Sequence, residues 1–138
     1  FGRASIPREG TDLTIFASSW MVRRSLEASE LLANEGISVE VVDPRTLVPL
    51  DEEAILRSVA KTGRLLVVDE CHLRCGVGSE IAATVAEHAY GDLLAPIRRL
   101  ATLDVPVPFS PPLEQYVEPT TAKILAAARS VTGVQSGA

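Results

Sequence analysis

Apolar residues recur along this chain with two periods, about two and about 3.6 residues, which are the repeats of strands and helices. The strand pattern occupies four segments, at residues 13–17, 37–43, 64–69 and 96–101. Helical patterns alternate with them, at residues 21–34, 51–61, 79–89 and 120–131. Because strands that alternate with helices form parallel sheets covered by helices, the pattern predicts an α/β domain.

Further signals refine this topology. The continuous apolar run at 64–69 is typical of a strand buried on both faces of a parallel sheet. The arginines within 96–101 favour an edge strand, and a short additional strand is expected near 4–6. Asp51 is a good N-cap residue for the second helix. The four prolines within 104–112 indicate an extended connection.

Composition limits the class of protein. A chain of 138 residues is enough for one domain, which we expect at 11–133, after a linker with the first short strand at 1–10 and before a flexible tail at 134–138. The net charge of −5 argues against nucleic-acid binding, and no apolar run approaches the roughly 20 residues of a membrane helix. Two cysteines make no disulfide framework, so a cytoplasmic location is expected. Eleven arginines against two lysines suggest a GC-rich bacterial source.

Candidate chemistry gathers where predicted strands end, because ligands of open α/β sheets bind beyond the carboxyl ends of strands. Three segments lie there, at 18–20, 43–46 and 69–78. Gly76 and Gly78 precede a helix and allow an anion-binding interpretation. The alternative is that they let the loop turn and the helix pack close to the sheet. We favour this alternative because the third glycine of a nucleotide-binding loop is missing.

Other side chains of the 69–78 segment suggest no active site. Cys71, His72 and Cys75 lack the second pair of ligands that zinc sites use, so the cysteines are expected to be small, partly buried fillers. Adjacent strand residues face opposite sides of a sheet, so Asp69 and Glu70 would not share a proton.

Arginines offer a structural use for these carboxylates. An ion pair of Asp69 or Glu70 with Arg45 or Arg74 is expected, and a buried bridge would make Arg45→Ala cost about 3–5 kcal/mol. Trp20 either lines a cleft or interface or is a half-buried residue at a helix start. Without a nucleophile–base pair or a metal set, the residues indicate a domain that serves a larger assembly.

Five stretches of the chain resemble one known family. They are 8–15, 36–51 with Asp43-Pro44-Arg45-Thr46, 61–70, 76–82, and 105–114 with Val105-Pro106-Val107-Pro108-Phe109. In order and over nearly the whole length, the chain resembles the C-terminal domain of transketolase-type thiamine diphosphate enzymes. More narrowly, it is similar to the beta subunit of the decarboxylase component of 2-oxoacid dehydrogenase complexes.

This resemblance implies a fold, and it implies that the catalytic groups lie in another part of the full enzyme. The fold would be a three-layer α/β/α sandwich with a five-stranded, mostly parallel mixed sheet whose first strand is antiparallel. Thiamine diphosphate, magnesium and the catalytic histidine would belong to the full enzyme outside this segment. We therefore expect no catalytic, cofactor-binding or metal residue here, and an isolated fragment that is inactive.

The resemblance also implies partners. They are the decarboxylase alpha subunit, a second beta subunit and the binding domain of the dihydrolipoyl acyltransferase, which an acidic surface would attract. Family members often carry an acidic residue at the position of Leu94, and Asp92 is a possible substitute. The structural or interface candidates are Arg45, Asp69, Glu70, Gly76, Gly78, Glu80, Asp92 and Leu94.

The implied activity of the full enzyme is oxidative decarboxylation of a 2-oxoacid with acylation of lipoyl groups. Residues 113–116 favour branched-chain substrates, and pyruvate and acetoin stay open.

The alternatives are the C-terminal domain of a transketolase or deoxyxylulose phosphate synthase, and a free-standing α/β module that binds anions at 76–79. The apolar connection at 105–112 is expected to mediate self-association.

Overall fold

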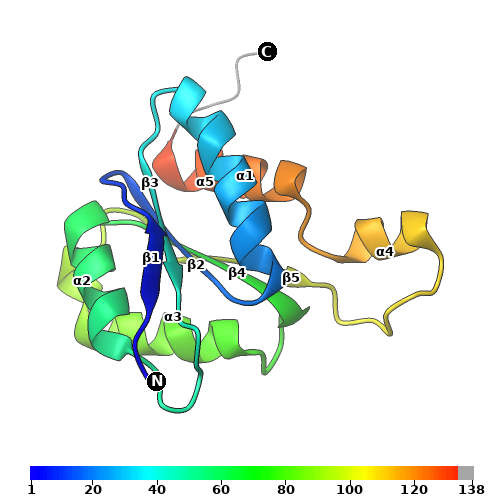
Figure 1. Cartoon of the computed structure of the whole chain (residues 1–138), viewed down its shortest axis with the longest axis horizontal. Helices are drawn as coiled ribbons and strands as arrows, with labels where there is room; N and C mark the ends of the chain where they lie inside the picture. Colours follow the sequence, from blue (N-terminus) through cyan, green and yellow to red (C-terminus); the bar gives the residue numbers. More distant parts are fainter. Residues whose placement is uncertain (134–138) are drawn as a thin grey trace.

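The computed structural model describes residues 1–133 and places five strands in one mixed sheet (Figure 1). The strands are β1 (Ser5–Arg8), β2 (Leu13–Ala17), β3 (Val39–Asp43), β4 (Leu65–His72) and β5 (Arg98–Thr102). Their spatial order is β1-β3-β2-β4-β5, with β1 antiparallel to β3 and all other pairs parallel. The predicted mixed sheet with an antiparallel first strand is confirmed.

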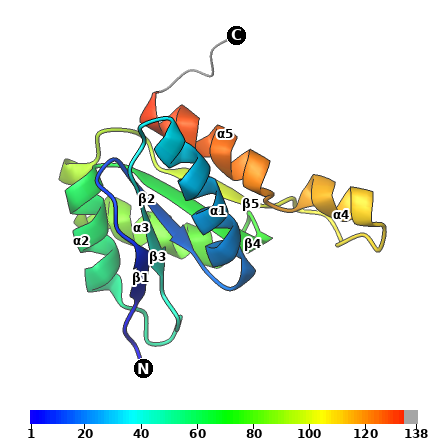
Figure 2. The same cartoon turned by 45° about the horizontal axis from the view of Figure 1, so that its top comes forward.

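Helices cover both faces of this sheet (Figures 1 and 2). On one face lie α1 (Trp20–Asn34) and α5 (Thr121–Thr132), and on the other lie α2 (Glu52–Thr62) and α3 (Val77–His88). A 3₁₀ turn (Tyr90–Asp92) and the short helix α4 (Pro111–Val117) complete the described elements. The layers confirm the predicted α/β/α sandwich. No helix within residues 1–133 is long and apolar enough to cross a membrane.

The central strand β2 separates two hydrophobic cores. Because strand side chains alternate between faces, Leu13 and Ile15 pack with α1 and α5, whereas Phe16 packs with α2 and α3. All five residues of β2 are buried. The continuous apolar run of β4 is buried on both faces over residues 65–69, as the sequence predicts.

Several element boundaries differ from the predicted ones. The third strand begins at Val39 rather than at residue 37, and β4 continues to His72. The segment 104–112 is not wholly extended, because α4 begins at Pro111. The edge position of β5 and the N-cap role of Asp51, whose Oδ1 accepts from the Ala54 N–H at 3.1 Å, are confirmed.

A buried polar cluster joins α2 to the sheet. The Glu40 carboxylate, 3% exposed, accepts hydrogen bonds from the Gly10 N–H at 3.3 Å and from the Lys61 ammonium. Nearby, the Thr14 hydroxyl lies 2.7 Å from the hydroxyls of both Ser58 and Thr62. Buried polar groups need partners, and this cluster supplies them within the domain.

We expect Glu40 to make stability depend on pH. Burial raises the pKa of Glu40, but hydrogen bonds from Lys61, Ser58 and Gly10 outweigh it and hold this pKa below its ordinary value of 4.5. A carboxylate with a lowered pKa stabilises the folded state above its unfolded pKa, and this contribution is lost as the pH falls below about 4.5. Glu40→Gln should therefore cost about 1–3 kcal/mol at pH 7 and less at pH 3.5 in urea unfolding. An equal cost at both pH values would contradict this assignment.

Candidate functional site

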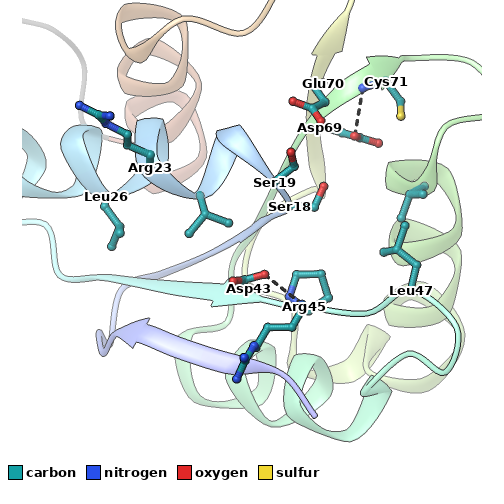
Figure 3. A pocket seen from close by; sticks show the side chains of 13 residues that line it. Ser18, Ser19, Arg23, Leu26, Asp43, Arg45, Leu47, Asp69, Glu70 and Cys71 are labelled. Atoms are coloured by element: carbon teal, nitrogen blue, oxygen red, sulfur yellow. Dashed lines mark hydrogen bonds between the residues drawn. The ribbon is translucent and has the colours of Figure 1, made fainter. Parts of the chain in front are cut away.

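A recess of about 820 Å³ opens at the carboxyl ends of β2, β3 and β4 (Figure 3). The chain passes from β2 to β3 on one side and then crosses to β4 on the other, so this edge is a topological switch point. Polar lining comes from Ser18 and Ser19 after β2, Asp43 and Arg45 at the end of β3, and Asp69, Glu70 and Cys71 on β4. The three segments that sequence reasoning placed at this edge therefore do meet there.

Asp69 is buried at this edge and acts as an internal cap. Its Oδ1 accepts from the Cys71 N–H at 3.0 Å, and its Oδ2 accepts from the Gly78 N–H at 3.3 Å. A negative charge at the start of α3 is favoured by the helix dipole. Because the chain's own carboxylate occupies this position, the structure argues against the alternative of a free-standing module that captures anions at 76–79.

Gly76 and Gly78 are required by close packing, as the favoured interpretation predicts. A Cβ atom at Gly78 would lie 3.1 Å from Cγ1 of Val67, so α3 lies close against β4. A Cβ atom at Gly76 would lie 2.4 Å from the carbonyl oxygen of His72. Gly76 therefore permits the close approach of the loop to the backbone of β4, and Gly78 permits the close approach of α3 to the sheet.

The predicted buried bridge of Arg45 is wrong. Arg45 is exposed with φ of 58°, and its backbone N–H donates to Asp43 Oδ1 at 2.9 Å. Among the ion pairs within residues 1–133, none involves Arg45, Asp69 or Glu70, and Arg74 instead pairs with Asp104 at 3.2 Å. Figure 3 shows the Arg45 side chain directed away from the two carboxylates. The reason for expecting a large effect of Arg45→Ala is therefore removed.

The cysteines are also placed differently from the prediction. Cys71 and Cys75 are both free and exposed, so neither is a partly buried filler. Desolvation, followed by the nearby Asp69 carboxylate, raises the pKa of the Cys71 thiol and disfavours the thiolate. The His72 ring nitrogen Nδ1 lies 2.9 Å from the carbonyl oxygen of Leu103, which ties the loop to the segment after β5. Within residues 1–133, no group of three or more potential ligands is arranged to hold a metal ion.

A second surface feature contains the predicted docking position. Leu94 is 72% exposed and lines a groove of about 640 Å³ together with Tyr90, Pro96 and Ile97. The Leu94 N–H donates to the carbonyl oxygen of Gly63 at 2.8 Å, which fixes the groove against the end of α2. Asp92 is exposed beside it, whereas Glu80 is exposed in the first turn of α3. The interface roles of Leu94, Asp92 and Glu80 stay predictions.

Trp20 is the first residue of α1 and is 49% exposed. Its ring lies beneath the Arg23 guanidinium, 5.0 Å from the ring centroid. Of the open interpretations, the structure favours the half-buried residue at a helix start.

Sequence reasoning missed two cationic residues that organise the segment around α4. Arg24 donates to the carbonyl oxygen of Pro119 at 2.5 Å and to the Glu118 carboxylate at 2.7 Å. The Lys123 ammonium donates to the carbonyl oxygen of Glu118 at 2.7 Å and to two further carbonyl oxygens at the end of α4. Partners 94 residues apart, as for Arg24, leave no local signal in the sequence.

This architecture is similar to that of known proteins. The profile described as "Transketolase, C-terminal domain" matches residues 2–124. A split-gene transketolase, described as an inactive beta4 tetramer, superposes with a TM-score of 0.83 at 30% identity, over 98% of this chain and 43% of that chain. A Pichia stipitis transketolase gives 0.64 at 14% identity, over 97% of this chain and 18% of that chain, and shows the fold alone.

Curated relatives are more similar in sequence. The beta subunits of acetoin:2,6-dichlorophenolindophenol oxidoreductase from Cupriavidus necator and Bacillus subtilis are 50% and 46% identical over 94% and 96% of this chain. The mitochondrial pyruvate dehydrogenase E1 beta subunit of Dictyostelium discoideum is 44% identical over 95%. The chain spans only 37–39% of the length of these three relatives. With a family profile over most of its length and these relatives in agreement, the chain belongs to the transketolase C-terminal domain family.

Proposed function

We propose that this chain is the C-terminal assembly domain of a beta subunit from a thiamine diphosphate-dependent 2-oxoacid dehydrogenase component. The observation that supports this best is identity of 41–50% to such beta subunits and to the acetoin enzymes over at least 93% of the chain. The solved transketolases are less similar in sequence, at 30% identity for the split-gene enzyme and 13–14% for the Pichia stipitis enzyme. The dehydrogenase branch is therefore favoured over the transketolase or deoxyxylulose phosphate synthase alternative.

The described residues do not fit thiamine diphosphate or magnesium. A diphosphate needs free backbone N–H groups or an excess of cations. At the carboxyl edge the Gly78 N–H already bonds to Asp69, and the two arginines of the recess, Arg23 and Arg45, share it with three carboxylates, Asp43, Asp69 and Glu70. The carboxylates of the recess are not arranged as a metal-ligand group. We therefore place the cofactor and its metal in the remaining part of the full enzyme, and this domain contributes assembly rather than chemistry.

The substrate of the full enzyme is not fixed by these similarities. The names of the relatives include acetoin, pyruvate and 2-oxoisovalerate enzymes at 43–50% identity. The preference for branched-chain 2-oxoacids therefore stays a prediction, alongside pyruvate and acetoin. A substrate pocket outside this segment accounts for the domain's similarity to all three classes.

The proposed partners are the alpha subunit, a second beta subunit and the acyltransferase binding domain, in the cytoplasm. The net charge of −5 would attract a basic acyltransferase domain. The groove at Leu94 offers it an apolar centre with Asp92 at the rim. The split-gene transketolase with the same fold is described as a beta4 tetramer, which supports association between copies of such subunits.

Reconstitution of the enzyme tests this function. The complete beta subunit that contains this segment would be co-expressed with its alpha subunit and supplied with thiamine diphosphate and magnesium. Decarboxylation or cleavage of pyruvate, a branched-chain 2-oxoacid or acetoin is expected, and the 138-residue chain alone should show no activity. Transfer of ketol groups between sugar phosphates, or cofactor binding by the isolated chain, would overturn the proposal.

A further inference from the structure

Both cysteines of the chain lie in one short stretch between β4 and α3. Cys71 is near the end of β4, and Cys75 lies two residues before α3 begins. Both thiols are free and exposed. This placement is unusual, because cysteine is among the residues most often buried in folded proteins, and exposed thiols are open to oxidation. Two exposed thiols four residues apart therefore indicate redox chemistry rather than packing.

The backbone turns back toward β4 between the two cysteines. Cys75 has a φ of 58°, in the left-handed region that residues other than glycine seldom adopt. Directly after it, the chain lies against the end of β4. A Cβ atom at Gly76 would lie 3.5 Å from the Cβ atom of Cys71 and 2.4 Å from the carbonyl oxygen of His72. The Cβ atoms of a disulfide lie about 3.8 Å apart, so a local movement of this turn is enough to join the two sulfur atoms.

Contacts with the end of β5 and the segment after it hold the middle of this turn in place. The Leu73 N–H donates to the carbonyl oxygen of Thr102 at 3.1 Å. Asp104 binds Arg74 twice, through the backbone N–H at 3.2 Å and through the guanidinium Nε at 3.2 Å. A turn that is anchored in this way keeps the two thiols near each other, and holding two reacting groups together favours their reaction over that in a free chain.

We propose that Cys71 and Cys75 form a reversible intramolecular disulfide at the carboxyl-edge recess, with a small-molecule disulfide as the oxidant. Cys71 lines this recess, which is open to a reactant of that size. The thiolate of one cysteine attacks a sulfur atom of the oxidant, breaks its S–S bond and releases one small thiol. The other cysteine then attacks the mixed disulfide, forms the bond between positions 71 and 75, and releases the second small thiol.

This exchange balances within the two reactants. The two cysteine thiols are oxidised, one small disulfide is reduced to two thiols, and the two cysteine protons end on the released thiols. An exposed disulfide is easily reduced again, so an excess of small thiol reverses both steps. The site would therefore report the thiol–disulfide balance of its surroundings.

Equilibration with glutathione tests the proposal. The chain would be incubated at increasing ratios of oxidised to reduced glutathione, its free thiols alkylated, and its peptides analysed by mass spectrometry for the bond between positions 71 and 75. Circular dichroism checks that the chain is folded. The folded chain should form this bond at a ratio about tenfold lower than the same chain in concentrated urea, because folding holds the thiols together. Excess reduced glutathione should restore both thiols.

A matched variant moves one thiol by a single residue. Glu70→Cys with Cys71→Ser keeps a nearly equal loop length, but Figure 3 shows the side chains at positions 70 and 71 pointing in different directions from β4. Folding should therefore give this variant no advantage over its urea-unfolded form. Equal ratios for the folded and unfolded natural pair, equal behaviour of the two pairs, or glutathione adducts and intermolecular disulfides in place of the 71–75 bond would each overturn the proposal. The proposed function is judged separately, by the activity of the reconstituted enzyme.

Discussion

Gly10→Ala should destabilise the domain by about 3 kcal/mol or more, at the upper end of the range for overpacking. A Cβ atom at this position would lie 2.1 Å from the carbonyl carbon of Val39 and 2.3 Å from the nitrogen of Glu40. These are backbone atoms of β3, which cannot rotate away as a side chain could. The change would also displace the Gly10 N–H from the buried Glu40 carboxylate.

Gly91→Ala is the matched control for this prediction. It is the same substitution, but nothing lies within 4 Å of the added atom and no positive φ is involved. Urea unfolding should therefore give a change within about 0.5 kcal/mol for Gly91→Ala. Similar free energies of unfolding for both variants would contradict this prediction. They would show that the backbone of β3 can shift to accommodate the added Cβ atom without loss of stability.

The alternation of periods predicted a sheet covered by helices, and the arginines within 96–101 predicted the edge position of β5. Apolar strands of this kind must be buried on both faces of the sheet, and the helices between the strands are the elements that can bury them. The antiparallel first strand came from the family resemblance together with a short apolar segment. Its pairing with β3, through Ser5 and Arg8, depends on long-range contacts that no local pattern specifies.

The helix α4 was missed because its prolines were interpreted only as strand breakers. Pro111 and Pro112 occupy the first turn of α4. Backbone N–H groups in the first turn have no acceptor within the helix, so proline loses no hydrogen bond there, and its fixed φ is already helical. The cue was in the sequence, since Ser110 precedes them and Leu113, Glu114 and Gln115 are good helix formers. Proline therefore marked a helix start here rather than a continuous extended connection.

At the candidate site, the sequence predicted which residues lie at the carboxyl edge of the sheet. It did not predict the directions in which their side chains point. Arg45 follows β3 as expected, yet its left-handed backbone conformation directs the side chain away from Asp69. The carboxylate of Asp69 instead binds N–H groups, which every residue but proline offers and which leave no sequence signal. Ion pairing between distant residues is for this reason a weak inference from sequence, whereas glycine at close approaches is a stronger one.

Asp69→Ala should destabilise the domain by about 2–3 kcal/mol, the range for hydrogen bonds to a charged group. The substitution leaves the N–H groups of Cys71 and Gly78 without their acceptor and removes a negative charge from the start of α3. Asp69→Asn retains one acceptor oxygen and should cost less than Asp69→Ala. Glu70→Ala is the neighbouring control, because its exposed side chain makes no hydrogen bond or ion pair within residues 1–133, and it should change the free energy of unfolding by about 0.5 kcal/mol at most. If urea unfolding ranks Glu70→Ala with Asp69→Ala, the capping role assigned to Asp69 is refuted.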